Sequence, residues 1–315
     1  MNSTKLGVSR QPLRGGQGNR KAARLTWTAA LCLGFAASSA SAGSVLERIK
    51  QSGKIVIGNR DASVPFSYLD ENRKPVGYAV DLCLKISEAI RKKLALTKLE
   101  IEYFTVTSAT RIAATADNQV DLECESTTNN AERRQKVAFA IPHYITGARY
   151  LVRADSPITE LTGFEGKKLV STVGTTPLKA VNAANRERLI GIHISEVPDH
   201  VRGVEMVEKG EADGFAMDEV LLVGLISSRP KPDALKIVGK YLTTEALGIM
   251  MPKTDPELKQ IVDAEIKRLI QSREAAAIHD RWFTQPIPPS GRSLNLPMNY
   301  LLKDFWKFPS DFVPN

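Results

Sequence analysis

Two hydroxyl residues and an arginine near the middle of the chain have the types and spacing of a carboxylate receptor. Residues 121–125 read as a strand that leads to Ser126 and Thr128, and Arg133 follows where the first turn of a helix is expected. Hydroxyl groups and free backbone N–H groups at such a junction donate to an anion, and a planar guanidinium binds both carboxylate oxygens side by side. These three residues therefore predict a binding site for a carboxylate.

A second half-site lies far along the chain. Residues 214–217 read as another strand, and it ends in Asp218, whose carboxylate could hold an ammonium group. A pocket with a fixed arginine on one side and a fixed aspartate on the other is complementary to a zwitterion. The ligand that this pair of half-sites predicts is an amino acid.

Residues 1–42 have the pattern of a cleavable export signal. Six basic residues with no acidic one precede a mostly apolar stretch, Leu25–Ala37, and the small residues Ala40, Ser41 and Ala42 follow it. The apolar stretch is several residues short of the roughly 20 that a membrane-spanning helix needs. Six of the formal +8 charges lie in this leader, so the mature chain carries only +2 and its charge gives no support for nucleic-acid binding. We expect an exported protein that reaches the periplasm after cleavage.

Two cysteines, Cys83 and Cys124, remain in the mature chain. An oxidising compartment would allow them to pair. Cys83, however, falls on the apolar stripe of an expected helix and Cys124 in an expected buried strand, and buried cysteines often act as small hydrophobic residues. We favour two unpaired core residues and keep a disulfide as the alternative.

Strands and helices alternate along the mature chain, as in an α/β fold. Strands are expected at 54–58, 99–106 and 120–124 in a first, parallel lobe, and at 168–172 and 214–217 in a second. An amphipathic helix is expected after Asp255 and an extended, proline-rich tail after Phe283.

Two extended stretches bracket the second set of elements. Residues 147–153 and 245–251 would be the paired crossing strands of a hinge, which makes the first lobe discontinuous. The expected division is then 43–148 for the first part of lobe one, 149–245 for lobe two, and 246–315 for the return helix of lobe one and the tail.

Short motifs occur along the whole mature chain in the order typical of one protein family. They are Gly58-Asn-Arg60, Pro65-Phe-Ser67, Gly77-Tyr78, Thr107-Ser-Ala-Thr-Arg111, Ser126-Thr-Thr-Asn-Asn-Ala-Glu-Arg133, Val173-Gly-Thr-Thr176, Asp199-His200, Met217-Asp218 and Trp282-Phe283. By these motifs the chain resembles the periplasmic solute-binding proteins of polar amino acid ABC transporters, and it looks most like their glutamate/aspartate-binding branch. The resemblance implies a two-lobed, type II periplasmic binding protein fold of the α/β class, with a two-strand hinge and a central cleft that closes on the ligand.

The resemblance also implies roles for individual residues. The α-carboxylate would be held by Arg133, Ser126 and Thr128, with Thr175 and Thr176 as further donors, and the α-ammonium by Asp218. Side-chain selectivity would come from Arg60, Ser108, Arg111 and His200. Glutamate or aspartate would be the ligand and an inner-membrane ABC permease the partner, with no cofactor and no metal, and the protein would be a monomer.

The charges of these residues point to the same ligand class. Arg60, Arg111 and Arg133 outnumber Asp218, so a second ligand carboxylate would fit the excess of positive charge.

Two residues depart from the family pattern: Asn59 before Arg60, where a histidine is familiar, and Glu125 before Ser126, where a glycine is expected. A Glu125 that pointed into the cleft would neutralise one arginine and favour glutamine or asparagine. Because side chains alternate along a strand, we expect Glu125 to point away from the cleft and to change little.

No catalytic constellation competes with this interpretation. The histidines, at 143, 193, 200 and 279, lack the spacing of metal ligands, and the sequence has no glycine-rich phosphate loop or nucleophile elbow. We therefore expect a binding protein and not an enzyme. The same fold hosts periplasmic enzymes such as cyclohexadienyl dehydratase-like proteins, in which a cleft carboxylate acts as a general acid, and Glu125 keeps this alternative open. A sensor input module is a third alternative, which would need a separate membrane partner.

Overall fold

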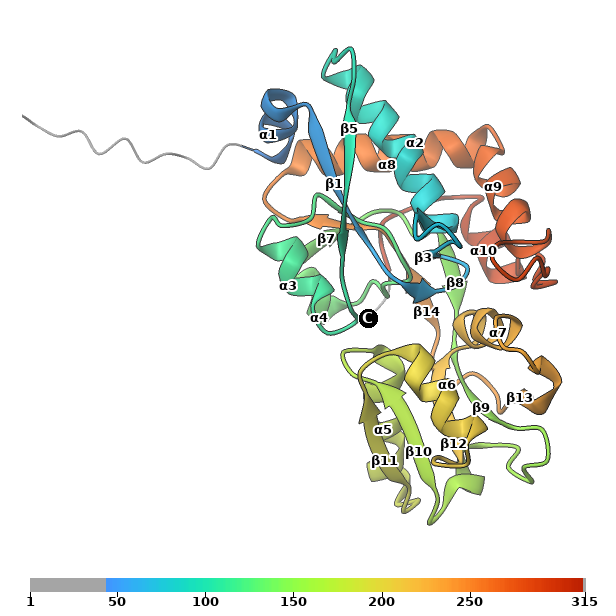
Figure 1. Cartoon of the computed structure of the whole chain (residues 1–315). Coiled ribbons are helices and arrows are strands. Elements are labelled where there is room, and N and C mark those ends of the chain that lie inside the picture. Colours follow the sequence, from blue (N-terminus) through green and yellow to red (C-terminus); the bar gives the residue numbers. More distant parts are fainter. Residues whose placement is uncertain (1–43, 314–315) are drawn as a thin grey trace, which may run out of the picture. The chain divides into compact units, whose positions relative to one another are not determined.

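The computed structural model describes residues 44–313, and the expected leader, residues 1–42, lies outside them. The described residues form two groups of helices and strands, each built on a five-stranded sheet, which we call lobe one and lobe two (Figure 1). None of the helices between residues 44 and 313 is long and apolar enough to cross a membrane.

Lobe one is built on a sheet with the strand order β5-β1-β6-β15-β7. β1 pairs in parallel with β5 and β6, whereas β15 runs antiparallel to β6 and β7. The sheet is therefore mixed, and not parallel throughout as the sequence pattern predicted. Its strands are β1 (Lys54–Asn59), β5 (Glu100–Thr105), β6 (Leu122–Glu123), β7 (Val137–Phe139) and β15 (Met250–Pro252).

The amphipathic helix predicted after Asp255 is confirmed as α8 (Pro256–Gln271). Asp255 caps its first turn by accepting a hydrogen bond from the Leu258 backbone N–H at 3.0 Å, and the buried stripe packs on α2 and α9. The other helices of this lobe are α1 (Val45–Ser52), α2 (Tyr78–Lys93), α3 (Arg111–Ala116), α4 (Ala131–Arg134), α9 (Glu274–Phe283) and, within the tail expected to be extended, the short α10 (Tyr300–Phe305).

A small antiparallel sheet of β2 (Ala62–Ser63), β3 (Ser67–Leu69) and β4 (Pro75–Val76) leads into α2. Gly77 makes this turn with a φ of 137°, and a Cβ there would lie 2.3 Å from the Phe66 carbonyl oxygen. Glycine alone avoids both the strain and the overlap.

Lobe two is built on a sheet with the order β11-β10-β12-β9-β13. β10 pairs in parallel with β11 and β12, and β9 runs antiparallel to β12 and β13. The strands are β9 (Ala148–Arg153), β10 (Lys168–Thr172), β11 (His193–Val197), β12 (Gly214–Asp218) and β13 (Leu235–Val238). The helices are α5 (Thr176–Arg188), α6 (His200–Glu208) and α7 (Glu219–Ser227), with the 3-10 turns η1 (Leu161–Phe164) and η2 (Pro232–Ala234).

Two short antiparallel strands, β8 (Tyr144–Thr146) and β14 (Glu245–Leu247), run between the two lobes (Figure 1). The crossing pair thus starts at residue 144 and not at 147 as predicted, because residues 148–153 are already β9 of lobe two, and residues 250–252 belong to β15 of lobe one.

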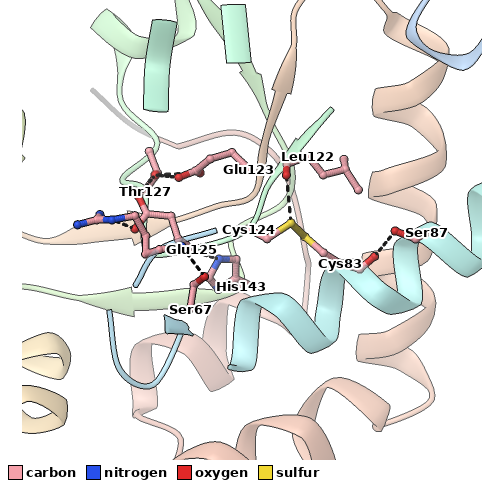
Figure 2. The surroundings of a disulfide bond; sticks show 10 residues. Ser67, Cys83, Ser87, Leu122, Glu123, Cys124, Glu125, Thr127 and His143 are labelled. Atoms are coloured by element: carbon pink, nitrogen blue, oxygen red, sulfur yellow. Dashed lines mark hydrogen bonds and ion pairs between the residues drawn. A yellow bond between two sulfur atoms is a disulfide. The ribbon is translucent and has the colours of Figure 1, made fainter. Parts of the chain in front are cut away.

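The expectation of two unpaired cysteines is wrong, because Cys83 and Cys124 form a disulfide (Figure 2). Cys83 faces the sheet from α2, and Cys124 directly follows β6, which brings their Cα atoms to 6.2 Å, within the range that a disulfide spans. The bond fixes the end of β6, where the predicted carboxylate receptor begins.

Candidate functional site

The predicted site residues lie at the carboxyl ends of strands, where ligands bind in open α/β sheets. In lobe one, Arg60, Ser108 and Ser126 follow β1, β5 and β6. In lobe two, Thr175 and His200 follow β10 and β11, and Asp218 ends β12. The remaining four lie on the loops and helices that begin there: Arg111 on α3, Thr128 on the loop before α4, Arg133 on α4, and Thr176 at the start of α5.

Residues of both lobes line a small cavity. Its lining includes eight of the ten predicted residues, namely Ser108, Arg111, Ser126, Thr128, Thr175, Thr176, His200 and Asp218, and it is completed by Pro177, Met217 and Leu221. The cavity offers about 10 Å³ for the centre of a water-sized sphere, which is room for about one water molecule. A larger cavity of about 550 Å³ shares His200 with it and has Arg60 in its lining.

Arg133 is buried beside the cavity and spans the two lobes. Its Nη1 donates to the Thr128 carbonyl oxygen at 2.8 Å, and its Nη2 donates to the Gly174 carbonyl oxygen of lobe two at 3.1 Å. The Asn130 side chain caps α4 by accepting from the Arg133 backbone N–H at 3.0 Å. Burial lowers the pKa of Arg133, and the nearby carboxylates of Glu245, Glu123 and Asp218 oppose this shift.

Asp218 lies on the opposite wall with 4% of its surface exposed, and its Oδ1 has no hydrogen-bond partner among the described residues. Burial raises the pKa of Asp218 well above its usual range, and Glu245 raises it further, while Arg111 and Arg133 oppose the shift. Because buried polar atoms are nearly always hydrogen-bonded, this oxygen is suited to a donor that comes with the ligand.

His200 is buried, and its Nδ1 lies 2.8 Å from Thr172 Oγ1. Burial lowers the pKa of His200 well below its usual range, and Arg60 and Arg111 lower it further. The imidazole is therefore neutral near pH 7, so His200 can share a hydrogen bond with a ligand but adds no positive charge.

The expectation that Glu125 points away from the site is wrong, because its carboxylate pairs with two predicted site residues, Arg60 and Arg111. Its side chain is fully buried, one carboxylate oxygen accepts from Arg60 Nη1 at 2.9 Å, and the other accepts from Arg111 Nη1. Ser126 lines the cavity and Glu125 does not, yet the Ser126 hydroxyl lies 3.4 Å from Glu125 Oε2, so the two side chains are in contact. Strand alternation does not apply to Glu125, because β6 ends at Glu123 and Glu125 lies in the loop that follows.

Three buried residues that the sequence reasoning missed also belong to this cluster. The Thr127 hydroxyl lies 3.0 Å from each carboxylate oxygen of Glu123 and 2.8 Å from Glu125 Oε1 (Figure 2). Glu245, on β14, accepts from Thr176 Oγ1 at 2.9 Å. Alternation from Glu125 could have indicated Glu123, whereas only the fold brings Glu245 to the site.

The prediction that arginines outnumber carboxyl groups at the site is therefore wrong. Among the described residues, the arginines at 60, 111 and 133 are accompanied by buried carboxyl groups at 123, 125, 218 and 245. Burial raises the pKa of Glu123 to about 7, against the opposing effect of Arg111, so this group is partly protonated near neutral pH. Burial lowers the pKa of Arg60 to about 10, which leaves it charged. Arg111 Nε is buried without a partner in the described chain and remains available as a donor.

Within residues 44–313, no group of three or more histidine, cysteine, aspartate or glutamate side chains is arranged to hold a metal ion.

Residues 55–285 match the family described as bacterial extracellular solute-binding proteins, family 3. The chain belongs to this family. It is 42% identical over 267 residues to the L-glutamate/L-aspartate-binding protein of Pseudomonas aeruginosa, covering 84% of this chain and 88% of that protein. It is 37% identical over 299 residues to the glutamate/aspartate import solute-binding protein of Escherichia coli, covering 94% and 99%.

Solved structures agree on the fold. An ancestral arginine-binding protein bound to arginine superposes with a TM-score of 0.66 at 22% identity, covering 73% of this chain and 98% of that one. An ancestral amino acid-binding protein described as a precursor of cyclohexadienyl dehydratase gives 0.65 at 24% identity, covering 76% and 99%. At this identity the likeness concerns the fold alone, and it confirms the predicted two-lobed type II architecture.

The family resemblance drawn from the sequence is thus confirmed, including the branch. The expectation of a solute-binding protein and not an enzyme is also confirmed, because the relatives at 37–42% identity are named as binding proteins of import systems or of the two acidic amino acids.

Proposed function

We propose that this chain is the periplasmic binding component of an amino acid ABC importer, that it binds glutamate or aspartate between its lobes, and that it delivers the ligand to an inner-membrane permease. The names of the relatives support the ligand class and the import system. The basic, apolar and small-residue succession in residues 1–42 supports export to the periplasm. The protein acts as a monomer in this proposal.

The convergence of the predicted residues of both lobes on one cavity carries the proposal. Asp218 offers an unpartnered carboxylate oxygen for the α-ammonium, and Arg133 with the hydroxyls of Ser126 and Thr128 would receive the α-carboxylate. Thr175 and Thr176 add donors from the start of α5. Arg60, Ser108, Arg111 and His200 would receive the ligand side chain, since they follow the neighbouring strand ends.

Binding would require the lobes to separate and close again, because a cavity with room for about one water molecule cannot admit an amino acid. Three contacts between the lobes would break on opening: Arg133 to the Gly174 carbonyl, Thr128 Oγ1 to Thr176 Oγ1 at 3.0 Å, and the ion pair of Lys179 with Glu132. Arg133 would then exchange a carbonyl partner for the ligand carboxylate, which is the stronger, charge-assisted interaction.

Calorimetric titration of the mature protein with the twenty amino acids tests this proposal, with the bound ligand recovered afterwards and identified by mass spectrometry. We expect glutamate or aspartate to bind and to be recovered unchanged. Failure of both to bind would refute the ligand class, and recovery of a converted product would refute the binding-protein function and favour the dehydratase alternative.

A further inference from the structure

Arg60 and Arg111, which are proposed to bind the ligand side chain, both pair with one carboxylate of the protein itself. Glu125 Oε2 accepts from Arg60 Nη1 at 2.9 Å, and Glu125 Oε1 pairs with Arg111 Nη1. The Thr127 hydroxyl donates to Oε1 at 2.8 Å, and the Ser126 hydroxyl lies 3.4 Å from Oε2. The buried Glu125 carboxylate thus accepts hydrogen bonds from the two arginines and from hydroxyls of its own loop.

The backbone of Glu125 is held as firmly as its side chain. Its carbonyl oxygen lies 3.1 Å from His143 Nε2, and the preceding residue, Cys124, is tied to α2 by the disulfide. Figure 2 shows Glu125 and His143 beside this bond. Glu125 therefore lacks the freedom to swing away when a second carboxylate arrives.

Arg111 contacts both Glu125 and the cavity. Arg111 lines the cavity, Ser108 and His200 line it with Arg111, and Glu125 does not. Arg60 is joined to the same group, since its Nη1 also donates to Ser108 Oγ at 3.0 Å. A ligand side chain would thus meet two arginines of which one positive charge is already offset by Glu125.

We propose that Glu125 sets the charge selectivity of this site: by pairing with both Arg60 and Arg111 and offsetting one of their two positive charges, it makes the protein accept glutamine and asparagine nearly as well as glutamate and aspartate. The inference rests on the proposed function, because it concerns the side-chain end of the same amino acid site. A ligand carboxylate is attracted by the arginines but repelled by Glu125. A ligand amide is attracted less, but Glu125 does not repel it and its desolvation costs less free energy.

Glu125 acts through the arginines and is a positioning residue, so the decisive readout is the ratio of the amide to the acid dissociation constant. This ratio responds to charge near the ligand side chain, whereas a general weakening of the lobe or of its closure changes all four dissociation constants together. A second carboxylate close to the first, at an effective dielectric constant of about 20, is enough to change such a ratio by about tenfold or more.

The experiment is calorimetric titration of glutamate, aspartate, glutamine and asparagine into wild type, Glu125→Gln, Glu125→Asp and the control Glu102→Gln. Glu125→Gln removes the charge and keeps the shape, and Glu125→Asp keeps the charge and shortens the side chain. Glu102 is an exposed glutamate on β5 that pairs with Lys54, so its substitution changes the same formal charge away from the site.

We expect a wild-type ratio within about tenfold of one, an increase of about tenfold or more in Glu125→Gln, and ratios close to wild type in Glu125→Asp and Glu102→Gln. A wild-type preference for the acids of about a hundredfold or more would overturn the inference even if Glu125→Gln fails to fold. An unchanged ratio in Glu125→Gln, or an equal increase in Glu125→Asp, would also overturn it, and in each of these cases the proposed function stands. If wild type binds none of the four amino acids, the proposed function itself fails.

Discussion

Replacing Asp218 with asparagine should weaken the binding of the ligand amine and leave the other contacts of the ligand site in place. The side chain keeps its size and loses its charge, in a position with 4% exposure where Oδ1 has no partner within the described residues. An ion pair about 4 Å long contributes about 4 kcal/mol at an effective dielectric constant of about 20. The raised pKa of Asp218 reduces this gain, because a protonated carboxyl group must release its proton before it can pair with the ammonium.

We therefore expect Asp218→Asn to weaken glutamate binding by about 2–4 kcal/mol, which is about 30-fold to 1,000-fold. Isothermal titration would compare glutamate with glutarate, a dicarboxylate that has no amine, and glutarate should be affected far less. Asp233→Asn, an exposed aspartate in η2 of the same lobe, is the matched control and should leave both ligands unchanged.

The pH dependence gives an independent readout of the same group. The ligand ammonium favours ionised Asp218, and burial raises the pKa of that group, so glutamate affinity should rise as the pH rises through this pKa. The slope should be smaller in Asp218→Asn. Equal losses for glutamate and glutarate, together with an unchanged slope, would refute the assignment of Asp218 to the ammonium.

Three further predictions concern the carboxylate receptor, the disulfide and the buried acid. Arg133→Ala should weaken every amino acid ligand by about 2–5 kcal/mol in the same titration, whereas the exposed Arg186→Ala should not, and binding within about threefold of wild type would contradict the assignment. Reduction of the Cys83–Cys124 bond, which closes a loop with a sequence separation of 41, should lower the free energy of urea unfolding by about 4 kcal/mol, and insensitivity to dithiothreitol would contradict the bond. In the native state the pKa of Glu123 is raised to about 7. At pH values between the ordinary pKa of a glutamate and about 7, the native state therefore binds more protons than the unfolded state, and the free energy of unfolding falls as the pH rises. Between pH 5 and 8 the free energy of unfolding should fall by about 2 kcal/mol less in Glu123→Gln than in wild type, and an equal fall in the two proteins would contradict the raised pKa of Glu123.

The sequence predicted the two-lobed architecture from local patterns and from the family resemblance, and the structure brings most of the predicted site residues together at one cavity. Alternating strands and helices indicated two α/β lobes, and residues at strand ends such as Arg60, Ser126 and Asp218 are brought together by any fold in which parallel strands share an edge. The direction of β9, β13 and β15 was missed, because the sequence of a strand does not record which way its neighbour runs.

The electrostatics of the site could not be predicted in the same way. The orientation of Glu125 was inferred from strand alternation, but β6 ends at Glu123, and Glu125 lies beyond it with its carboxylate paired to Arg60 and Arg111. The pairing of Cys83 depended on a distance across a helix and a sheet, which spacing along the chain does not give. Long-range contacts of this kind decide the net charge of the site, and that is why the charge count from the sequence was wrong.

The most direct test of the central claim is a crystal structure of the mature protein grown with glutamate. We expect a ligand enclosed between the lobes, with its amine within hydrogen-bonding distance of the Asp218 carboxylate and its α-carboxylate on the Arg133 guanidinium. Its side chain should point toward Arg111, with Glu125 still paired to that arginine. A ligand held elsewhere, for example in the larger cavity lined by Arg60 and His200, or bound with its amine away from Asp218, would refute the proposed ligand site.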